Sequence, residues 1–212
     1  MARFAILLGG NLNVTRRLRV QVAGARVIAA DSGMTHASLL GIIPELWVGD
    51  FDSAGSELAL RYGDVPRETY PPDKDATDGS LAIAAAIARG GDQFVLAGGL
   101  GGQADHTLGH FGQILYLARE GFAGFITSGD EEAHPVIPGT TMLDVPPQSR
   151  LSLIPFTDLA GLDLEGVKWP LADRTVPLGS TLTLSNVALG PVRISLRSGH
   201  AIAVVYPRFT DD

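Results

Sequence analysis

Residues 26–33 read RVIAADSG, an apolar run that ends in an acidic residue, a serine and a glycine. Every residue from Val27 to Ala30 is apolar, so a strand here would have apolar side chains on both of its faces. This predicts a strand with both faces buried. A short helix is predicted to follow at 35–40, so the polar residues fall in a strand-to-helix turn. Such a strand is typical of a parallel sheet that is covered by helices.

The same alternation of apolar strands and helices extends in both directions from this stretch. Further strands are predicted at 4–8, 46–48, 94–97 and 125–127. Helices are predicted at 12–23, 35–40, 81–89 and 106–120, the third of them beginning near Thr77. We therefore predict an α/β fold whose N-terminal part is a mostly parallel sheet with helices on both faces.

The pattern changes near residue 135, after which polar and apolar residues alternate in period two. Strands are predicted at 141–145, 151–156, 162–164, 181–184, 192–196 and 201–206. Glycine and proline separate these segments, and no helical stretch intervenes. This predicts a small antiparallel C-terminal domain, a β-sandwich or half-barrel. The boundary is expected between Ser128 and Thr140, which divides the chain into domains 1–134 and 135–212.

Composition narrows the class of protein. The 212 residues are 45% hydrophobic and 18% charged, enough apolar material for a sizeable core. The net charge is −7 and no basic stripe occurs, which argues against nucleic acid as a partner. The absence of Cys excludes disulfides and thiolate chemistry. No signal peptide is recognisable and no stretch approaches the ~18 apolar residues of a membrane span, so we expect a cytoplasmic protein that does not bind membranes.

Acidic residues follow two of the predicted strands, where an open parallel sheet binds its ligands. Asp31 follows the strand at 26–30, and Asp50 and Asp52 follow the strand at 46–48. Alternate residues of an extended segment point the same way, so Asp50 and Asp52 can converge. Converging carboxylates repel each other unless a cation lies between them, and Mg²⁺ prefers such oxygen ligands. Each segment could instead only cap the helix that follows it.

A third acidic segment, DKDATD at 73–78, precedes the helix predicted at 81–89. Three carboxylates and a lysine exceed what one helix cap needs. Asp78 lies near a helix N-terminus, which favours its ionised form and suits a metal ligand. Lys74 could contact phosphate as a point charge. The simpler alternative is a helix cap made by Asp75 or Thr77.

A glycine-rich loop, GGLGGQADH at 98–106, joins a predicted strand to a helix. Glycine lets backbone N–H groups approach phosphate, and the helix that follows adds its positive end. The loop lacks the Gly-Lys-Ser/Thr of a Walker A loop and is a poor dinucleotide fingerprint. An ordinary turn, with His106 as a helix-start residue, is the alternative. Together, however, the four segments indicate a site for a magnesium–nucleotide complex.

The order of these segments resembles the thiamine pyrophosphokinase family. That family has an Asp-Gly-Gly-like segment, then Gly-Asp-Phe-Asp-Ser, a Lys-Asp-x-Thr-Asp-like segment, a Gly-Gly-Arg-x-Asp-His-like segment and a late Ser-Asn. The corresponding stretches here are 31–33, 49–53, 74–78, 101–106 and 185–186, and 166–171 resembles a further family stretch. The resemblance spans about Ala5 to Tyr206. Gln103 stands where the family usually has Arg, and no aromatic residue follows Ser185-Asn186 directly.

The resemblance implies transfer of a diphosphate from ATP to the hydroxyl of thiamine, giving AMP and thiamine diphosphate. It implies Mg²⁺ and a homodimer, with a nucleotide-binding catalytic domain at 1–134 and a thiamine-binding and dimerisation domain at 135–212. Asp31, Asp50, Asp52 and Asp78 are the predicted catalytic residues, and the last three of these would bind Mg²⁺. The general base is left open.

The remaining predicted site residues bind the two substrates. Those expected to hold ATP are Gly33, Lys74, Asp75, Thr77, Gly101, Gly102, Gln103, Asp105 and His106. Ser185 and Asn186 are expected to bind thiamine, and Trp169 is a candidate to stack on it.

Two other classes of function remain open at this point. Asp50-Phe51-Asp52 could be the metal-binding Asp-x-Asp of a nucleotide-sugar glycosyltransferase; a phosphatase that uses Asp-x-Asp normally carries it after the first strand. A non-catalytic nucleotide or thiamine sensor is the other alternative, favoured by the neutral Gln103. Slow hydrolysis of a sugar nucleotide, with none of ATP, would favour the glycosyltransferase. Tight ligand binding without turnover would favour the sensor.

Overall fold

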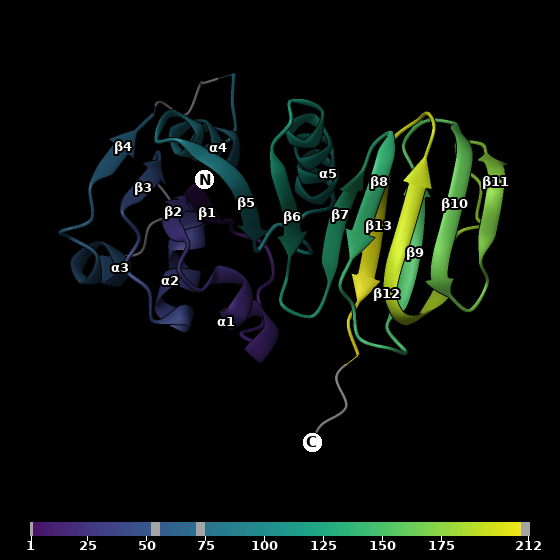
Figure 1. Cartoon of the computed structure of the whole chain (residues 1–212). Coiled ribbons are helices and arrows are strands. Elements are labelled where there is room, and N and C mark those ends of the chain that lie inside the picture. The colour runs from purple at the N-terminus through teal and green to yellow at the C-terminus, as the bar shows by residue number, and fades with distance from the viewer. Residues whose placement is uncertain (1, 52–55, 71–74, 209–212) are drawn as a thin grey trace. The chain divides into compact units, whose positions relative to one another are not determined.

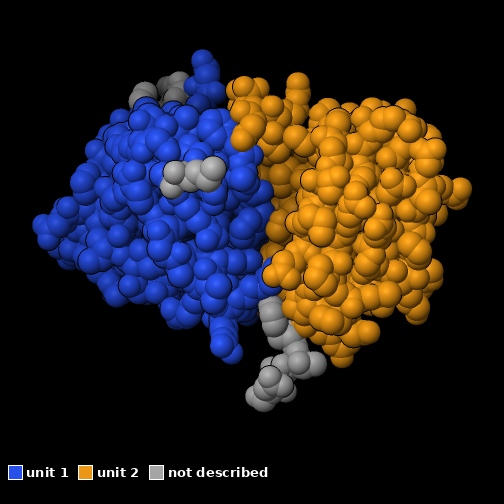
Figure 2. All heavy atoms as spheres, viewed as in Figure 1, with its two compact units in different colours: residues 1–113, 122–129 blue, residues 114–121, 130–212 orange. Residues whose placement is uncertain are grey.

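The computed structural model describes residues 2–51, 56–70 and 75–208. The chain forms two compact units, coloured separately in Figure 2. Unit 1 comprises Met1–Gln113 and Phe122–Gly129, and unit 2 comprises Ile114–Gly121 and Asp130–Asp212. The structure shows these two compact units, and the functional domains 1–134 and 135–212 stay a prediction.

Unit 1 is built on a parallel sheet with strand order β6-β5-β1-β2-β3-β4 (Figure 1). Every neighbouring pair in this part of the sheet is parallel. The strands are β1 (Ala2–Leu7), β2 (Arg26–Ala30), β3 (Leu46–Gly49), β4 (Arg67–Thr69), β5 (Gly91–Ala97) and β6 (Ala123–Thr127). The helices are α1 (Arg16–Val22), α2 (Met34–Leu40), α3 (Ser56–Arg61), α4 (Asp78–Ala88) and α5 (Ala104–Arg119), with a 3-10 turn, η1, at Asp31–Gly33. The part of α5 from Ile114 onward belongs to unit 2.

Helices cover both faces of this sheet because the strand residues are apolar on both sides. Ala5 and Leu7 of β1 pack in one core cluster with Leu18 of α1 and Met34 of α2. On the opposite face α4 packs against β2 and β3, and Leu8 lies directly below its first turn. The predicted parallel sheet with helices on both faces is confirmed.

Unit 2 is a β-sandwich made of antiparallel strands. The strands are β7 (Glu132–Val136), β8 (Gly139–Leu143), β9 (Arg150–Pro155), β10 (Leu159–Val167), β11 (Leu171–Val176), β12 (Asn186–Leu196) and β13 (Ala201–Tyr206). The long strand β12 serves two sheets, pairing with β9 at its start and with β8 and β10 beyond it. Leu153 of β9 and Ile194 of β12 belong to one buried core. The predicted C-terminal β-sandwich is confirmed.

Three strands were not predicted, and one predicted strand is wrong. Residues 181–184 form a turn, in which the Thr183 hydroxyl donates to the Leu153 carbonyl. The strand in this region is β11, whose middle residues are polar and exposed, so its sequence carries no apolar alternation. Strands β4 and β7 are short, and β7 contains Pro135.

Helix α1 is shorter than the predicted 12–23 because the Thr15 side chain caps it, accepting from the Leu18 amide. None of the helices in the described part of the chain combines the length and apolarity that crossing a membrane requires.

Candidate active site

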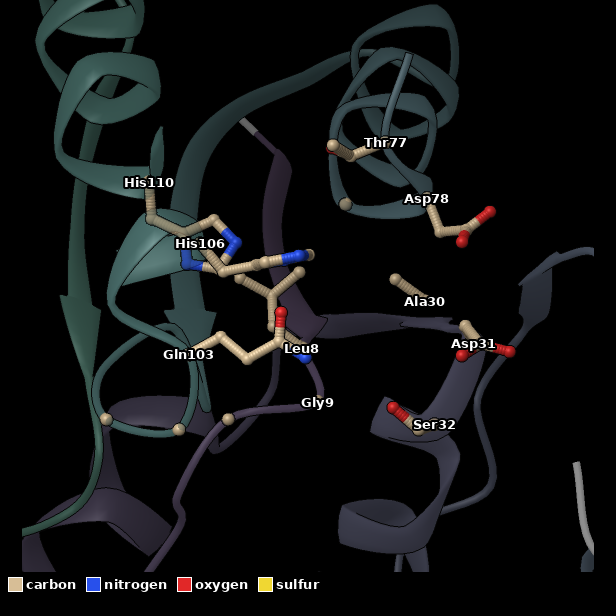
Figure 3. Close-up of a pocket in the computed structure, with 14 residues that line it drawn as sticks. Leu8, Gly9, Ala30, Asp31, Ser32, Thr77, Asp78, Gln103, His106 and His110 are labelled. Atoms are coloured by element: carbon tan, nitrogen blue, oxygen red, sulfur yellow. The ribbon is translucent and has the colours of Figure 1, made fainter. Parts of the chain in front are cut away.

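A cavity of about 420 Å³ opens in unit 1, at the carboxyl ends of β1 and β2 (Figure 3). It lies where ligands bind in open parallel sheets, and its volume is ordinary for a small-molecule site. Backbone segments 8–10, 30–32 and 101–103 line it together with residues 77–79 at the start of α4. His106 and His110 of α5 complete the lining.

Asp31 is held at the cavity by the neighbouring strand. Its carbonyl oxygen accepts a hydrogen bond of 2.9 Å from the indole N–H of Trp47, a fully buried residue of β3. The backbone of Asp31 has φ +42°, a left-handed conformation that non-glycine residues rarely adopt. Residues held in this region cluster at functional sites, because the surrounding structure must enforce them. The local geometry therefore supports a functional role for Asp31.

Trp47 also positions the segment that follows β3. Its ring makes an edge-to-face contact with Phe51, with ring centroids 5.0 Å apart. Phe51 too has a left-handed backbone, with φ +65°. Because Ala30 pairs with Val48, Asp31 and Asp50 leave adjacent strands at neighbouring points. Asp50 is half-buried and does not line the cavity itself. Asp52 lies outside the described residues.

Thr77 and Asp78 begin α4 at the cavity. The Thr77 hydroxyl caps the helix, accepting from the Ser80 amide at 3.2 Å. This is the structural role that the sequence left as the simpler alternative, and Thr77 combines it with a place in the cavity lining. Asp78, the first helical residue, also lines the cavity, so its carboxylate benefits from the positive end of α4.

The glycine-rich loop packs tightly against the end of β1. Gly98 has φ +80°, and a Cβ placed on it would lie 2.3 Å from the Leu8 carbonyl oxygen, so only glycine fits. The Gly10 amide donates to the Gly98 carbonyl and the Asn11 amide to that of Leu100. These bonds bring segment 9–10 and residues 101–103 to the same cavity.

Several predicted residues lie away from the cavity lining. Gly33 is buried behind it, against the backbone of Leu7. Asp75 is exposed, and Asp105 accepts the His106 amide in the first turn of α5. Lys74 lies outside the described residues. The predicted residues that do line the cavity are Asp31, Thr77, Asp78, Gly101, Gly102, Gln103 and His106.

Sequence reasoning missed part of the lining. Gly9 and Gly10 directly follow the strand predicted at 4–8. They indicate a strand-to-loop turn as clearly as the later glycine-rich loop does, but they carry no side chain that would suggest a chemical role. His110 lies one helical turn after His106, on the same face of α5, and this spacing could have identified it.

In unit 2 the predicted thiamine-binding residues lie beside the candidate stacking residue. The Asn186 amide donates to the Trp169 carbonyl at 2.8 Å, and its oxygen accepts from the Trp169 amide at 3.2 Å. Asn186 is buried, whereas Trp169 is 54% exposed. Ser185 has a left-handed backbone, with φ +59°. Asn186 therefore holds the backbone that presents an exposed indole ring.

Comparison with known proteins gives a consistent result. A model described as the thiamin pyrophosphokinase catalytic domain matches residues 21–124, and one described as the thiamin pyrophosphokinase vitamin B1 binding domain matches residues 141–200. Thiamine pyrophosphokinase from Bacillus subtilis (strain 168) is 34% identical over 165 residues, 75% of this chain and 76% of the relative. The chain belongs to the thiamine pyrophosphokinase family.

Solved structures of the family have the same fold. A thiamine pyrophosphokinase structure from Bacillus subtilis superposes with a TM-score of 0.86 and 26% identity, covering 98% of this chain and all of that one. The yeast thiamin pyrophosphokinase has a TM-score of 0.79 at 14% identity, covering 98% and 86% of the two chains, and shows the fold alone. The cavity lies within the stretch that matches the catalytic-domain model, apart from its residues in segment 8–10.

A buried histidine behind the cavity is expected to make the stability of the protein depend on pH. His36 is buried, and its Nε2 lies 2.9 Å from the Gly10 carbonyl oxygen. Burial lowers the pKa of His36, and hydrogen bonds to the backbone oppose this only in part. Because the unfolded chain then binds the proton more tightly, the stability contributed by neutral His36 is present above about pH 6.5 and lost as the pH falls below it.

We therefore expect the free energy of unfolding to fall between pH 6.5 and pH 5.5, by up to about 1.4 kcal/mol per pH unit for each such histidine. His36→Gln retains a donor for the Gly10 carbonyl but cannot titrate, so this variant should show a shallower slope. Denaturant unfolding at a series of pH values measures both slopes. Equal slopes in the two proteins would show that His36 does not contribute.

Proposed function

We propose that the protein catalyses transfer of diphosphate from ATP to the hydroxyl of thiamine, giving thiamine diphosphate and AMP. Family membership supports this reaction. The observation that carries the site assignment is the charge of the cavity. Two carboxylates, Asp31 and Asp78, line it. A polyphosphate binds beside carboxylates only with cations that neutralise both.

The residues present suit Mg²⁺ in this role. The described residues contain no group of three carboxylate or histidine side chains close enough to hold a metal alone. Mg²⁺ does not require one, because it is commonly held by one or two carboxylates together with phosphate oxygens and water. Asp31 and Asp78 would provide these carboxylates, with Asp50 and Asp52 from the neighbouring segment. Bound Mg²⁺ supplies positive charge that stabilises the phosphates during transfer.

The chain's own groups would orient the triphosphate. The N-terminus of α4 lines the cavity on the side of Asp78, and the positive end of its helix dipole favours anions there. The backbone at Gly101 and Gly102 approaches the same space, and Gln103 adds a neutral side-chain donor. With the β-phosphorus held in place, the thiamine hydroxyl attacks it and AMP leaves. Positioning and charge are expected to supply much of the acceleration.

Thiamine is expected to use unit 2. The exposed indole ring of Trp169, held by the buried Asn186, offers a flat surface on which a heteroaromatic ring can stack. In this proposal Ser185 and Asn186 contribute to thiamine binding partly by positioning the indole ring of Trp169. We further propose a homodimer, which sedimentation analysis can test, and a cytoplasmic location, where ATP is supplied.

The decisive experiment is product analysis by mass spectrometry after the pure protein is mixed with Mg²⁺, ATP and thiamine. We expect AMP and thiamine diphosphate in equal amounts. Release of ADP with thiamine monophosphate would contradict diphosphate transfer. Tight binding of both substrates with no product would favour the sensor alternative, for which the neutral Gln103 in the cavity is the relevant observation.

A further inference from the structure

His110 lines the cavity but has no role in the reaction described above. It projects from α5, one turn beyond His106, and the two rings make an edge contact with centroids 6.3 Å apart. Figure 3 shows both histidines on one side of the cavity and the carboxylates of Asp31 and Asp78 on the other.

The hydrogen bonding of His110 determines which ring nitrogen carries the proton. Its Nδ1 lies 2.9 Å from the carbonyl oxygen of Gly99. Because a carbonyl only accepts, Nδ1 must carry the hydrogen. The loop that presents this carbonyl is fixed, since the Gly98 amide donates to Thr127 and the Gly98 carbonyl accepts from Gly10. The ring is therefore held in one orientation, with Nε2 at its free end.

The charge of the ring determines what Nε2 can bind. Burial lowers the pKa of His110; the bond to Gly99 opposes this, and the nearby His106 lowers the pKa further. At neutral pH the ring is neutral, so Nε2 is a hydrogen-bond acceptor. Within the described residues, Nε2 has no hydrogen-bond partner. It lies across from the first turn of α4, 3.8 Å from the point where a Cβ on Gly79 would be.

An acceptor at this position does not suit phosphate. Phosphate oxygens at neutral pH are themselves acceptors, so they repel the lone pair of Nε2. Phosphates neutralised by Mg²⁺ belong on the carboxylate side of the cavity, beside Asp31 and Asp78. The nucleoside of the same molecule is then left for the histidine side, where it can offer N–H and O–H donors.

We propose that His110 is a nucleotide-binding residue whose Nε2 accepts a hydrogen bond from a donor on the nucleoside of ATP. The donor is the exocyclic amino group of adenine or a ribose hydroxyl, which have the same hydrogen-bonding chemistry. This proposal rests on the proposed function in one respect, that ATP occupies the cavity. His110 then favours nucleotides that carry the donor over those that lack it.

Two variants separate this role from a structural one. In His110→Asn the side-chain amide can still donate to the Gly99 carbonyl, but nothing replaces Nε2. In His110→Gln the longer side chain can place an oxygen near the position of Nε2. Calorimetric titration with Mg-ATP is expected to show binding about tenfold weaker for the Asn variant and partly restored for Gln, as for the loss of one hydrogen bond. Binding of Mg-tripolyphosphate should be the same in all three proteins.

Nucleotide analogues identify the donor. ITP lacks the exocyclic amino group, and 2′-deoxy-ATP and 3′-deoxy-ATP each lack one hydroxyl. The analogue that lacks the contacted group should bind the Asn variant and the unsubstituted protein equally well.

Three results would overturn the proposal. These are equal Mg-ATP affinity in the Asn variant, an equal loss of affinity for tripolyphosphate, or a fall in kcat at unchanged ATP affinity, which would make His110 a proton acceptor for the thiamine hydroxyl instead. The proposed reaction is judged separately, by AMP release. If the protein binds Mg-ATP with the expected dependence on residue 110 but forms no AMP, the reaction is wrong and the role of His110 stands.

Discussion

Asp78→Asn is expected to lower the turnover of ATP and thiamine to AMP at least a hundredfold. The substitution keeps the size of the side chain and removes its charge from a cavity where the described lining carboxylates are Asp31 and Asp78. A hundredfold loss corresponds to about 2.7 kcal/mol of transition-state stabilisation, the size expected for one charged group with the proposed role of holding Mg²⁺ and triphosphate. The Mg²⁺ concentration needed for half-maximal activity should also rise.

Asp78 begins α4, so the same substitution weakens a favourable interaction with the helix dipole. That effect is expected to be only about 0.3–1 kcal/mol of stability. Glu57→Gln is the matched control, because Glu57 lies in the first turn of α3 and does not line the cavity. It should melt at nearly the same temperature as the unsubstituted enzyme and keep full turnover. If Asp78→Asn retained turnover within about threefold, Asp78 would not take part in the reaction.

Gly33→Ala is expected to produce the largest loss of stability. A Cβ on Gly33 would lie 2.1 Å from the carbonyl oxygen of Leu7 and 2.6 Å from its carbonyl carbon. Both atoms belong to the backbone of β1, a central strand that pairs on both sides and cannot move aside. We expect a loss of about 3 kcal/mol in the free energy of unfolding. Activity should fall as well, since the turn that contains Gly33 also carries Asp31.

Gly112→Ala is the control for this prediction. Gly112 is exposed within α5, and a Cβ there would meet no atom within 4 Å. Alanine is the better helix former, so this variant should be more stable by about 0.5–1 kcal/mol. Thermal or denaturant unfolding of both variants provides the test. An unchanged melting temperature in Gly33→Ala would mean that the close approach of this turn to β1 is relaxed in solution.

Local sequence was informative where the physical signal is itself local. The strand β2 was predicted at its observed bounds, because a continuous apolar run, with apolar side chains on both faces of the strand, is typical of buried parallel strands. The start of α4 was predicted because Thr77 is a capping residue. Strand β11 was not predicted, because pairing with β10 makes it a strand although most of its side chains remain in solvent.

The sequence by itself determined the α/β class and the change to antiparallel strands in the C-terminal part, and it supplied the residue types expected of a magnesium–nucleotide site. These follow from periodicity and from the preference of carboxylates, glycines and helix starts for strand ends. Only the tertiary structure decided that Asp31, Asp78 and residues 101–103 share one cavity, that Gly33 supports it from behind, and that Asn186 holds Trp169. It also identified His110, whose free Nε2 depends on a carbonyl eleven positions earlier in the chain. The reason is that these relations depend on strand order and on loops packed against one another, which residue spacing along one chain does not specify.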